Sequence, residues 1–282
     1  MIKRSEKFPL RRAVIYITII TCLVSGTAGS AILYYFHLKR LRAQDEAYQV
    51  IAIVQTGLHK ETLRTVYLAE LLGLSIDRPT NLYQVNLKTE KQKLLASPLI
   101  KSAEITKIKP GTLIIDYVPR IPVAFLGDFT NTALDEEGFL IPFKPFFSPK
   151  KLPEIYLGNM GDEIKWGKAV EGKRGELAMS LFPFFSALCK EEGLILKTID
   201  VSQAEALSLG QRQIIVEFED SRNVWILRCS LENFNVEMTR YIALRRHIQL
   251  TEDKGNESYI RVLDLRIPQL AFLKSEKKLT KR

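Results

Sequence analysis

The chain has 282 residues and a formal net charge of +9 at pH 7, with 41 Lys and Arg against 32 Asp and Glu. Its basic residues are not clustered as in a nucleic-acid interface: many flank an apolar segment near the N-terminus or lie in residues 274–282. The length allows one or two domains with hydrophobic cores. Three cysteines indicate no disulfide framework, so we expect Cys189 and Cys229 to be free, buried thiols.

Residues 13–36 form the longest uncharged stretch of the chain. A helix of that length measures about 36 Å, enough to cross a hydrocarbon core of about 30 Å. The sequence therefore predicts a single transmembrane helix. The basic residues before and after this stretch are Lys3, Arg4, Lys7, Arg11 and Arg12, against Lys39, Arg40 and Arg42. This excess predicts a cytoplasmic basic tail at residues 1–12 and a periplasmic location for the bulk of the chain, as in a single-pass type II protein of the inner membrane.

A cleaved signal peptide is the alternative interpretation of the same segment. The small residues at 27–31, TAGSA, are compatible with a cleavage site. However, the apolar run resumes and continues to Phe36, so it exceeds the 7–15 residues or so of a signal-peptide core. The length favours an uncleaved anchor.

The first exported segment, residues 44–119, shows five elements in a row. The pattern predicts a strand at 48–55, helices at 59–74 and 87–97, and strands at 100–108 and 112–118. This β-α-α-β-β order predicts two helices packed on one face of a three-stranded sheet. We expect its buried residues to include Leu63, Val66, Leu71 and Leu94.

The second exported segment, residues 120–273, predicts a mixed α/β domain with a β-sheet flanked by helices, so the whole chain is of the α+β class. The predicted elements are a helix at 174–192, kinked or split at Pro183, strands at 194–201, 214–219 and 224–228, and a helix with Ser230 as its N-cap. On that last helix Arg245 extends the apolar stripe to the rim of the core. Residues 274–282 are expected to form a disordered basic tail.

Several motifs occur in a specific order along these two segments. LYQVNL at 82–87, IKSA at 100–103 and PGTLII at 110–115 resemble a POTRA domain. PRIPVA at 119–124, LDEEG at 134–138, KLPEI at 151–155 and VLDLR at 262–266 are similar to motifs of the FtsQ/DivIB family of bacterial cell-division proteins. The chain departs from the family pattern at two positions: Pro119 replaces an acidic residue and Ile267 replaces a tyrosine.

The resemblance implies a membrane-anchored, non-enzymatic scaffold of the divisome that holds the FtsB/FtsL pair beside the septal peptidoglycan synthase. It further implies binding by β-strand addition just after the Asp-Leu-Arg motif, on the last strand at 266–273. Pro268 supports a sheet edge there, because proline cannot donate to a ladder. The implied partner-binding residues are Arg266, Ile267, Gln269, Leu270, Ala271, Phe272 and Leu273. A plain terminal strand that caps the core remains the alternative.

Within that set, the resemblance implies that Arg266 pairs with an acidic residue of the partner. Phe272 is the expected apolar anchor, because buried aromatic residues tend to dominate interfaces. Partners other than divisome proteins are not indicated, and neither nucleic acid nor a small-molecule substrate is expected.

Catalytic patterns are absent from the sequence. His59 and His247 are too far apart in sequence to indicate a metal pair, and no phosphate-binding glycine loop or nucleophile motif occurs. Asp135, Glu136 and Glu137 are interpreted as a solvated turn rather than an acid–base group. We therefore expect no enzyme activity and no cofactor.

Two other classes of protein are alternatives to the scaffold. An envelope-anchored enzyme with a POTRA-like accessory domain would need a convergent polar pocket, which the sequence does not indicate. An outer-membrane assembly factor would need several POTRA repeats and a barrel of alternating strands, and the chain has one copy.

Overall fold

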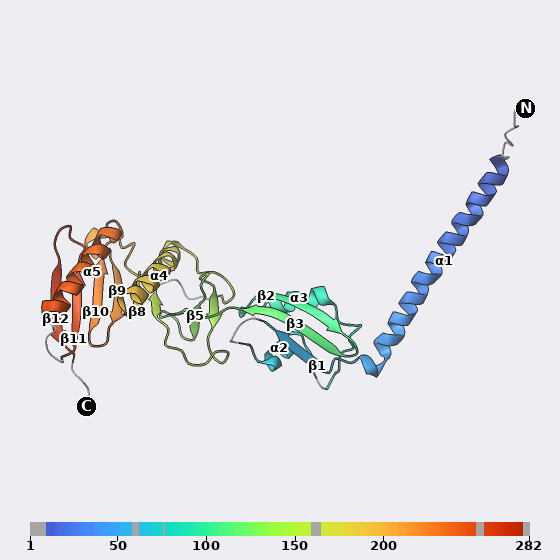
Figure 1. Cartoon of the computed structure of the whole chain (residues 1–282), viewed down its shortest axis with the longest axis horizontal. Coiled ribbons are helices and arrows are strands. Elements are labelled where there is room, and N and C mark those ends of the chain that lie inside the picture. The colour runs from blue at the N-terminus through green and yellow to red at the C-terminus, as the bar shows by residue number, and fades with distance from the viewer. Residues whose placement is uncertain (1–9, 58–61, 76, 159–164, 252–256, 279–282) are drawn as a thin grey trace, which may run out of the picture. The chain divides into compact units, whose positions relative to one another are not determined.

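The computed structural model describes residues 10–57, 62–75, 77–158, 165–251 and 257–278. It is a mixed α+β protein with one N-terminal apolar helix, a small sheet and a large sheet (Figure 1). The chain forms two compact units. The first contains most of the chain up to Tyr117, and the second contains the chain from Val118 onward together with residues 59–64 and 95–102.

The N-terminal helix α1 runs from Leu10 to Gln44. Its part from Ala13 to Gln44 is long and apolar enough to cross a membrane by length and composition. Hydroxyl groups within it are satisfied locally, since Thr18 donates to the Val14 carbonyl and Thr21 to the Ile17 carbonyl. Such bonds remove the cost of placing a polar group in hydrocarbon. The helix continues beyond the predicted span, and residues 1–9 of the predicted tail lie outside the described part.

The first unit has the predicted β-α-α-β-β order. Its elements are β1 (Ala52–Thr56), α2 (Thr65–Leu71), α3 (Leu87–Leu95), β2 (Ile100–Ile108) and β3 (Thr112–Pro119). The strand order is β1-β3-β2, with β1 parallel to β3. The first strand begins four residues later than predicted, because a short 3-10 helix occupies Glu46–Tyr48. The predicted helix start at His59 lies outside the described residues.

The prediction of buried residues in this unit is partly wrong. Leu63 and Leu94 are buried as expected, but the side chain of Val66 is 67% exposed and Leu71 is only half-buried. Helix α2 has seven residues and places Leu68 and the following Leu72 inward, one turn apart. Val66 lies on a different face of the helix from Leu68 and Leu72. The predicted helix began at His59, and this longer helix led to the wrong buried face.

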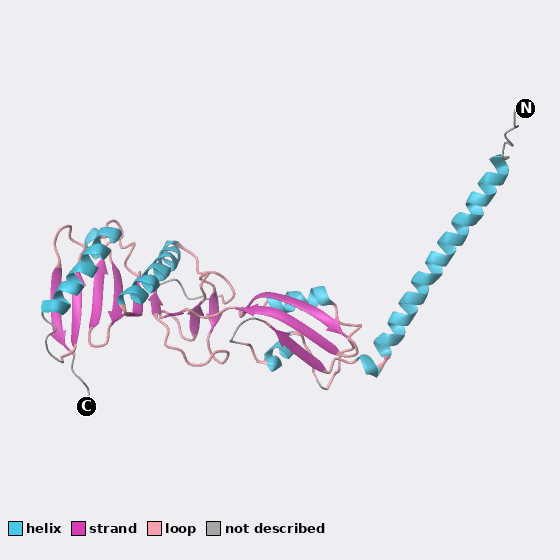
Figure 2. Cartoon of the chain, viewed as in Figure 1, coloured by secondary structure: helices cyan, strands magenta, loops and turns pink. Residues whose placement is uncertain are grey.

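The second unit contains a nine-stranded sheet in the order β12-β11-β10-β9-β8-β7-β4-β5-β6. Its strands are β4 (Ala124–Leu126), β5 (Thr132–Leu134), β6 (Leu140–Pro142), β7 (Glu154–Tyr156), β8 (Ile195–Asp200), β9 (Ile214–Glu219), β10 (Val224–Cys229), β11 (Tyr259–Asp264) and β12 (Phe272–Lys277). Two long helices accompany them, α4 (Lys173–Glu192) and α5 (Phe234–Thr251) (Figure 2).

An aromatic cluster fixes both long helices on one face of this sheet. The ring of Phe218 on β9 lies 5.6 Å from Phe185 of α4 and 5.5 Å from Tyr241 of α5, measured between ring centroids. Tyr241 also meets Trp225 of β10 edge-on at 6.4 Å. All four side chains are buried. Aromatic pairs of this kind add to the free energy gained by area burial, so the cluster anchors the helices to the sheet.

Helix α4 runs through Pro183 without a break, which excludes the split but not the kink among the two expected outcomes. Two other expectations for the second unit need correction. Helix α5 begins at Phe234, so Ser230 is not its N-cap and instead hydrogen-bonds the Glu237 carboxylate through both its backbone N–H and its hydroxyl. Arg245 is not at the rim: it is 5% exposed and its guanidinium lies 3.0 Å from the Glu192 carboxylate. A cation can be buried there because α4 supplies its counter-charge.

We expect Leu68→Ala to lower the free energy of unfolding of the first unit by about 2–5 kcal/mol, because it removes a fully buried side chain and leaves a cavity. Val66→Ala, two residues earlier on the same helix, is the matched control and should stay within about 0.5 kcal/mol of the parent. Urea titration of a fragment comprising residues 44–282, followed by far-ultraviolet circular dichroism, measures both. Equal effects of the two changes would contradict this assignment of the core.

Candidate functional site

The edge strand β12 defines the candidate site. It pairs antiparallel with β11, with Asp264 opposite Phe272 and Tyr259 opposite Lys277, and it ends the strand order of the described sheet. The predicted last strand at 266–273 is therefore displaced: only Phe272 and Leu273 of that segment belong to β12. The same strand takes in Lys274–Lys277, which we expected in a disordered tail. Residues 279–282 of that tail lie outside the described part.

The remaining predicted binding residues form the connection between β11 and β12. In this connection Leu270 donates its backbone N–H to the Ile267 carbonyl, and Gln269 has a positive φ of 64°. The side chains of the segment lie at the surface: Ile267, Leu270 and Phe272 are each about half exposed. A turn of exposed apolar residues leading into an edge strand is typical of a binding surface.

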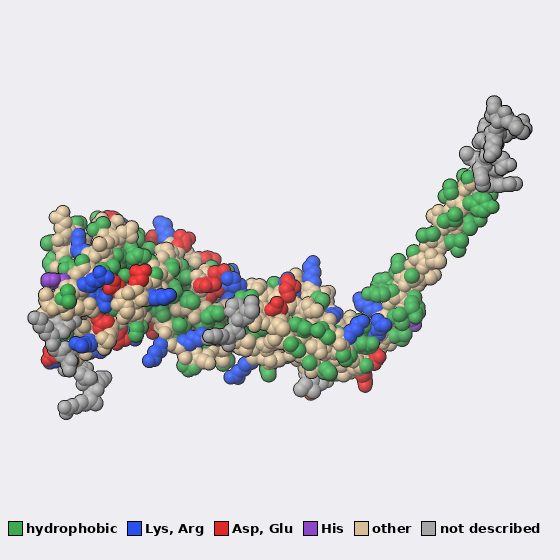
Figure 3. All heavy atoms as spheres, in the orientation of Figure 1, with side chains coloured by type: hydrophobic (Ala, Val, Ile, Leu, Met, Phe, Trp, Pro, Cys, Tyr) green, Lys and Arg blue, Asp and Glu red, His purple; other side chains and the backbone are tan. Residues whose placement is uncertain are grey.

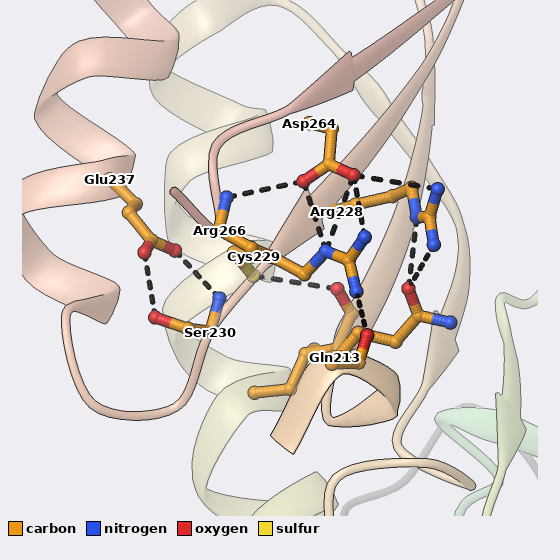
Figure 4. A network of polar contacts seen from close by, with 9 residues as sticks. Gln213, Arg228, Cys229, Ser230, Glu237, Asp264 and Arg266 are labelled. Carbon is orange, nitrogen blue, oxygen red and sulfur yellow. Dashed lines mark hydrogen bonds and ion pairs between the residues drawn. The ribbon is translucent and has the colours of Figure 1, made fainter. Parts of the chain in front are cut away.

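Arg266 is held by a carboxylate of its own strand end (Figure 4). Its guanidinium donates to Asp264 through Nε at 3.0 Å and Nη2 at 2.8 Å, and to the Gly210 carbonyl through Nη1 at 3.0 Å. Asp264 is the last residue of β11, and Arg266 follows it by two positions. The resemblance implied that Arg266 pairs with a partner's acid, but its first partner is internal. The i, i+2 spacing was the signal that sequence reasoning overlooked.

Arg228 extends this network across β10. Its Nη1 lies 3.4 Å from Asp264 Oδ2, and its Nε and Nη2 donate to Gln213 Oε1 at 2.9 and 2.6 Å. Asp264 is thus placed between two guanidinium groups. Burial by itself would raise the pKa of Asp264, but hydrogen bonds from Arg266 and the charge of both arginines lower it overall. The same pairing raises the pKa of Arg266. The lowered pKa of Asp264 keeps its carboxylate charged at neutral pH.

A pocket of about 530 Å³ lies beside the start of β12. Its walls combine apolar side chains with the polar network just described. The lining includes Leu209, Leu231, Ile267, Pro268 and Phe272 together with Arg212, Asp264 and Arg266. Three of the seven predicted binding residues, Arg266, Ile267 and Phe272, therefore meet in one hollow next to the open strand.

The motifs at 119–124 and 134–138 come together away from this edge. Asp135 is not solvated as predicted but buried, and its carboxylate lies 2.5 Å from Arg120 Nη1. The Arg120 guanidinium also lies 3.6 Å from the centroid of the Phe139 ring. Asp135 further accepts hydrogen bonds from the backbone N–H groups of Glu137 and Phe139. The two motifs thus hold the β5–β6 turn together. The partners of the Asp135 carboxylate come from the chain itself.

The part of the chain that the structure describes offers no cluster of three His, Cys, Asp or Glu side chains that could hold a metal. Cys189 and Cys229 are free and buried, as predicted. Burial raises the pKa of Cys189 to about 11, so this thiol is unreactive at neutral pH.

These features define a class: a protein with an N-terminal apolar helix of membrane-spanning length, a small POTRA-type β-α-α-β-β unit and a large sheet with one open edge. Comparison with family models agrees, since residues 61–117 match the family described as "POTRA domain, FtsQ-type". No curated protein gives a significant match to the chain. The match supports the identification of the chain with the FtsQ/DivIB family of bacterial cell-division proteins, and the apolar helix fits a single-pass protein of the inner membrane.

We expect Asp264→Asn to destabilise the second unit by about 1–3 kcal/mol at pH 7, because two arginines lose a charged acceptor. The folded protein holds the pKa of Asp264 below its unfolded value of about 3.9. The contribution of this carboxylate is therefore fully present above that value and is lost as the pH falls through the lower folded pKa. Denaturant unfolding at pH 7 and near pH 3 should show that the difference in free energy of unfolding between parent and variant becomes smaller in acid. A gap of constant size would contradict the role of the charge.

Proposed function

We propose that this protein is a scaffold of the bacterial divisome that binds an FtsB/FtsL-type pair during septum formation by adding a strand of the partner to β12. The observation that carries the proposal is the position of β12 at the end of the sheet, paired on one side only within the described chain. An unpaired strand edge presents a row of N–H and C=O groups to a partner. The FtsQ-type domain supports a partner among division proteins.

The side chains of β12 indicate what the partner strand should look like. The strand begins with the exposed apolar pair Phe272 and Leu273 and continues with the charged residues Lys274, Glu276 and Lys277. An apolar partner residue near Phe272 would cover the pocket beside it, and polar or acidic residues would follow along the lysines. Phe272 is the proposed anchor, and the other proposed contacts are Arg266, Ile267, Gln269, Leu270, Ala271 and Leu273.

Arg266 contributes through the network that already holds it. A partner carboxylate near its guanidinium would join Asp264 as a second acceptor rather than meet a free side chain. Arginine is suited to this, because its planar group offers five donors. Removing Arg266 would therefore take away the partner's contact and also loosen the turn that leads into β12.

The proposed layout follows the sequence. Residues 1–12 form a cytoplasmic tail, 13–36 span the membrane, and two domains, 44–119 and 120–273, lie outside the cytoplasm. The larger basic excess before the span supports this orientation. Protease added to spheroplasts should digest the part after Tyr48. A protected C-terminal part, or a mature N-terminus near Ala31, would contradict the proposed topology.

We expect Arg266→Glu and Phe272→Ala to weaken binding of the soluble halves of an FtsB/FtsL pair to residues 44–282, each by about 2–5 kcal/mol, because the first reverses a charge at the pocket and the second removes its anchor. Isothermal calorimetry measures this, with circular dichroism as the check on folding. Lys173→Glu and Val66→Ala are matched controls on exposed helix positions. Parent-like binding by both folded edge variants would overturn the proposal.

Hydrogen exchange tests the strand-addition mechanism directly in the same complex. Backbone amides of β12 should exchange more slowly when the partner is bound, because new ladder hydrogen bonds form. Amides of β6, at the opposite end of the sheet, serve as the internal control. Binding without protection of β12 would place the partner elsewhere.

A further inference from the structure

Four cations gather where α1 ends. Lys39 and Arg42 belong to the last turns of α1, and Lys107 and Lys109 belong to the end of β2 and the turn after it. Figure 3 shows basic side chains grouped at this end of the helix. Three of the four are exposed and Lys107 is half-buried.

An aromatic ring organises this group. The Arg42 guanidinium and the Lys109 ammonium each lie 5.9 Å from the centroid of the Tyr83 ring. Tyr48 packs edge-on against the same ring at 5.0 Å. Cation–π contacts hold the two positive charges near one another although they repel.

The end of α1 is fixed to the same loop by hydrogen bonds. The Asn81 side-chain amide donates to the carbonyls of Arg42 and Asp45 at 2.9 Å, and the Gln84 amide donates to the Ala43 carbonyl at 3.1 Å. These bonds satisfy carbonyls that a helix end leaves open. The cations of α1 and those near Tyr83 are therefore held in one place by the fold.

No carboxylate of the described part of the chain forms an ion pair with these four side chains. Two carboxylates lie three residues from one of these cations. Asp45 accepts from the backbone N–H of Ala47, and Glu104 pairs with Lys91. Burial, followed by repulsion from Lys39, lowers the pKa of Lys107. A cluster of like charges without a counter-ion is unfavourable, and an external anion would relieve it.

The depth of the cluster indicates which anion is available. Lys39 follows the last residue of the uncharged span, Phe36, by three residues and Arg42 follows it by six. At 1.5 Å per residue they lie about 5 and 9 Å beyond the hydrocarbon core, within or at the rim of the headgroup layer. Phosphate groups of lipids occupy this layer in either leaflet, so the argument does not depend on the orientation of the chain.

We propose that Lys39, Arg42, Lys107 and Lys109, arranged around Tyr83, form a site for the phosphate headgroup of an anionic phospholipid at the point where the chain leaves the membrane. The site is distinct from β12 and needs no division partner. It would couple the first unit to the membrane surface through charge as well as through the chain itself.

The test uses the full chain in nanodiscs of equal amounts of phosphatidylcholine and phosphatidylglycerol, with native mass spectrometry to count the lipids retained by the protein. We expect phosphatidylglycerol to be retained over phosphatidylcholine by roughly fivefold, the effect expected of one or more basic residues near a charged surface. Arg42→Gln combined with Lys109→Gln should bring this ratio close to one. If the first pair perturbs folding, a second pair, Lys39→Gln with Lys107→Gln, provides the test. It should also lower the lipid ratio.

The matched control is Lys144→Gln with Lys168→Gln, which removes the same charge from exposed positions of the second unit. This pair should leave the lipid ratio of the parent unchanged. The proposal is overturned if the parent retains both lipids equally, as a site for an acidic protein segment would, or if the control pair lowers the ratio as much as the test pair.

Discussion

The packing of Tyr241 against Phe218 and Trp225 is the contact on which the candidate site depends. Strands β10 and β11 are parallel, so a tight turn cannot join them and the chain must cross over one face of the sheet. Helix α5 makes that crossover, and Tyr241 fixes it there. Once β11 is placed, the short connection through Ile267 returns the chain antiparallel as β12. The open edge thus exists because a buried aromatic contact holds the helix that precedes it.

The two edge strands of the large sheet, β6 and β12, differ in whether another segment of the chain covers them. At the β6 end, Leu140 exchanges backbone hydrogen bonds with Gly167 and Lys168, so another segment of the chain covers that edge. At the β12 end the described chain supplies no such cover. Lys274 and Lys277 of β12 place charges there instead, as in proteins that must keep an edge open without aggregating. Reversible strand addition requires an edge of this kind, which carries charged side chains but is not covered by another segment.

The sequence predicted correctly those strands in which buried and more exposed residues alternate. Ile214, Val216 and Phe218 point inward, and β9 has the predicted bounds because each of them is fully buried. Strand β12 has no such alternation, since every residue of it is exposed, and the apolar residues before it led the prediction to the wrong segment. The predictions for Arg245 and Asp135 failed for another reason. Their partners, Glu192 and Arg120, are brought close only by the tertiary fold.

The internal pairing of Arg266 changes how the proposed contact works energetically. A free arginine would lose side-chain entropy and solvation when it met a partner's acid, and these losses would offset much of the gain. Here Asp264 and the Gly210 carbonyl already hold the guanidinium in place, so the ordering cost falls on folding rather than on binding. The same carboxylate also reduces the net positive charge that a partner would meet. The edge therefore has a preorganised donor group but a weaker long-range attraction for an acidic partner. In the proposed complex we expect Arg266 to contribute specificity and Phe272 to contribute most of the apolar contact.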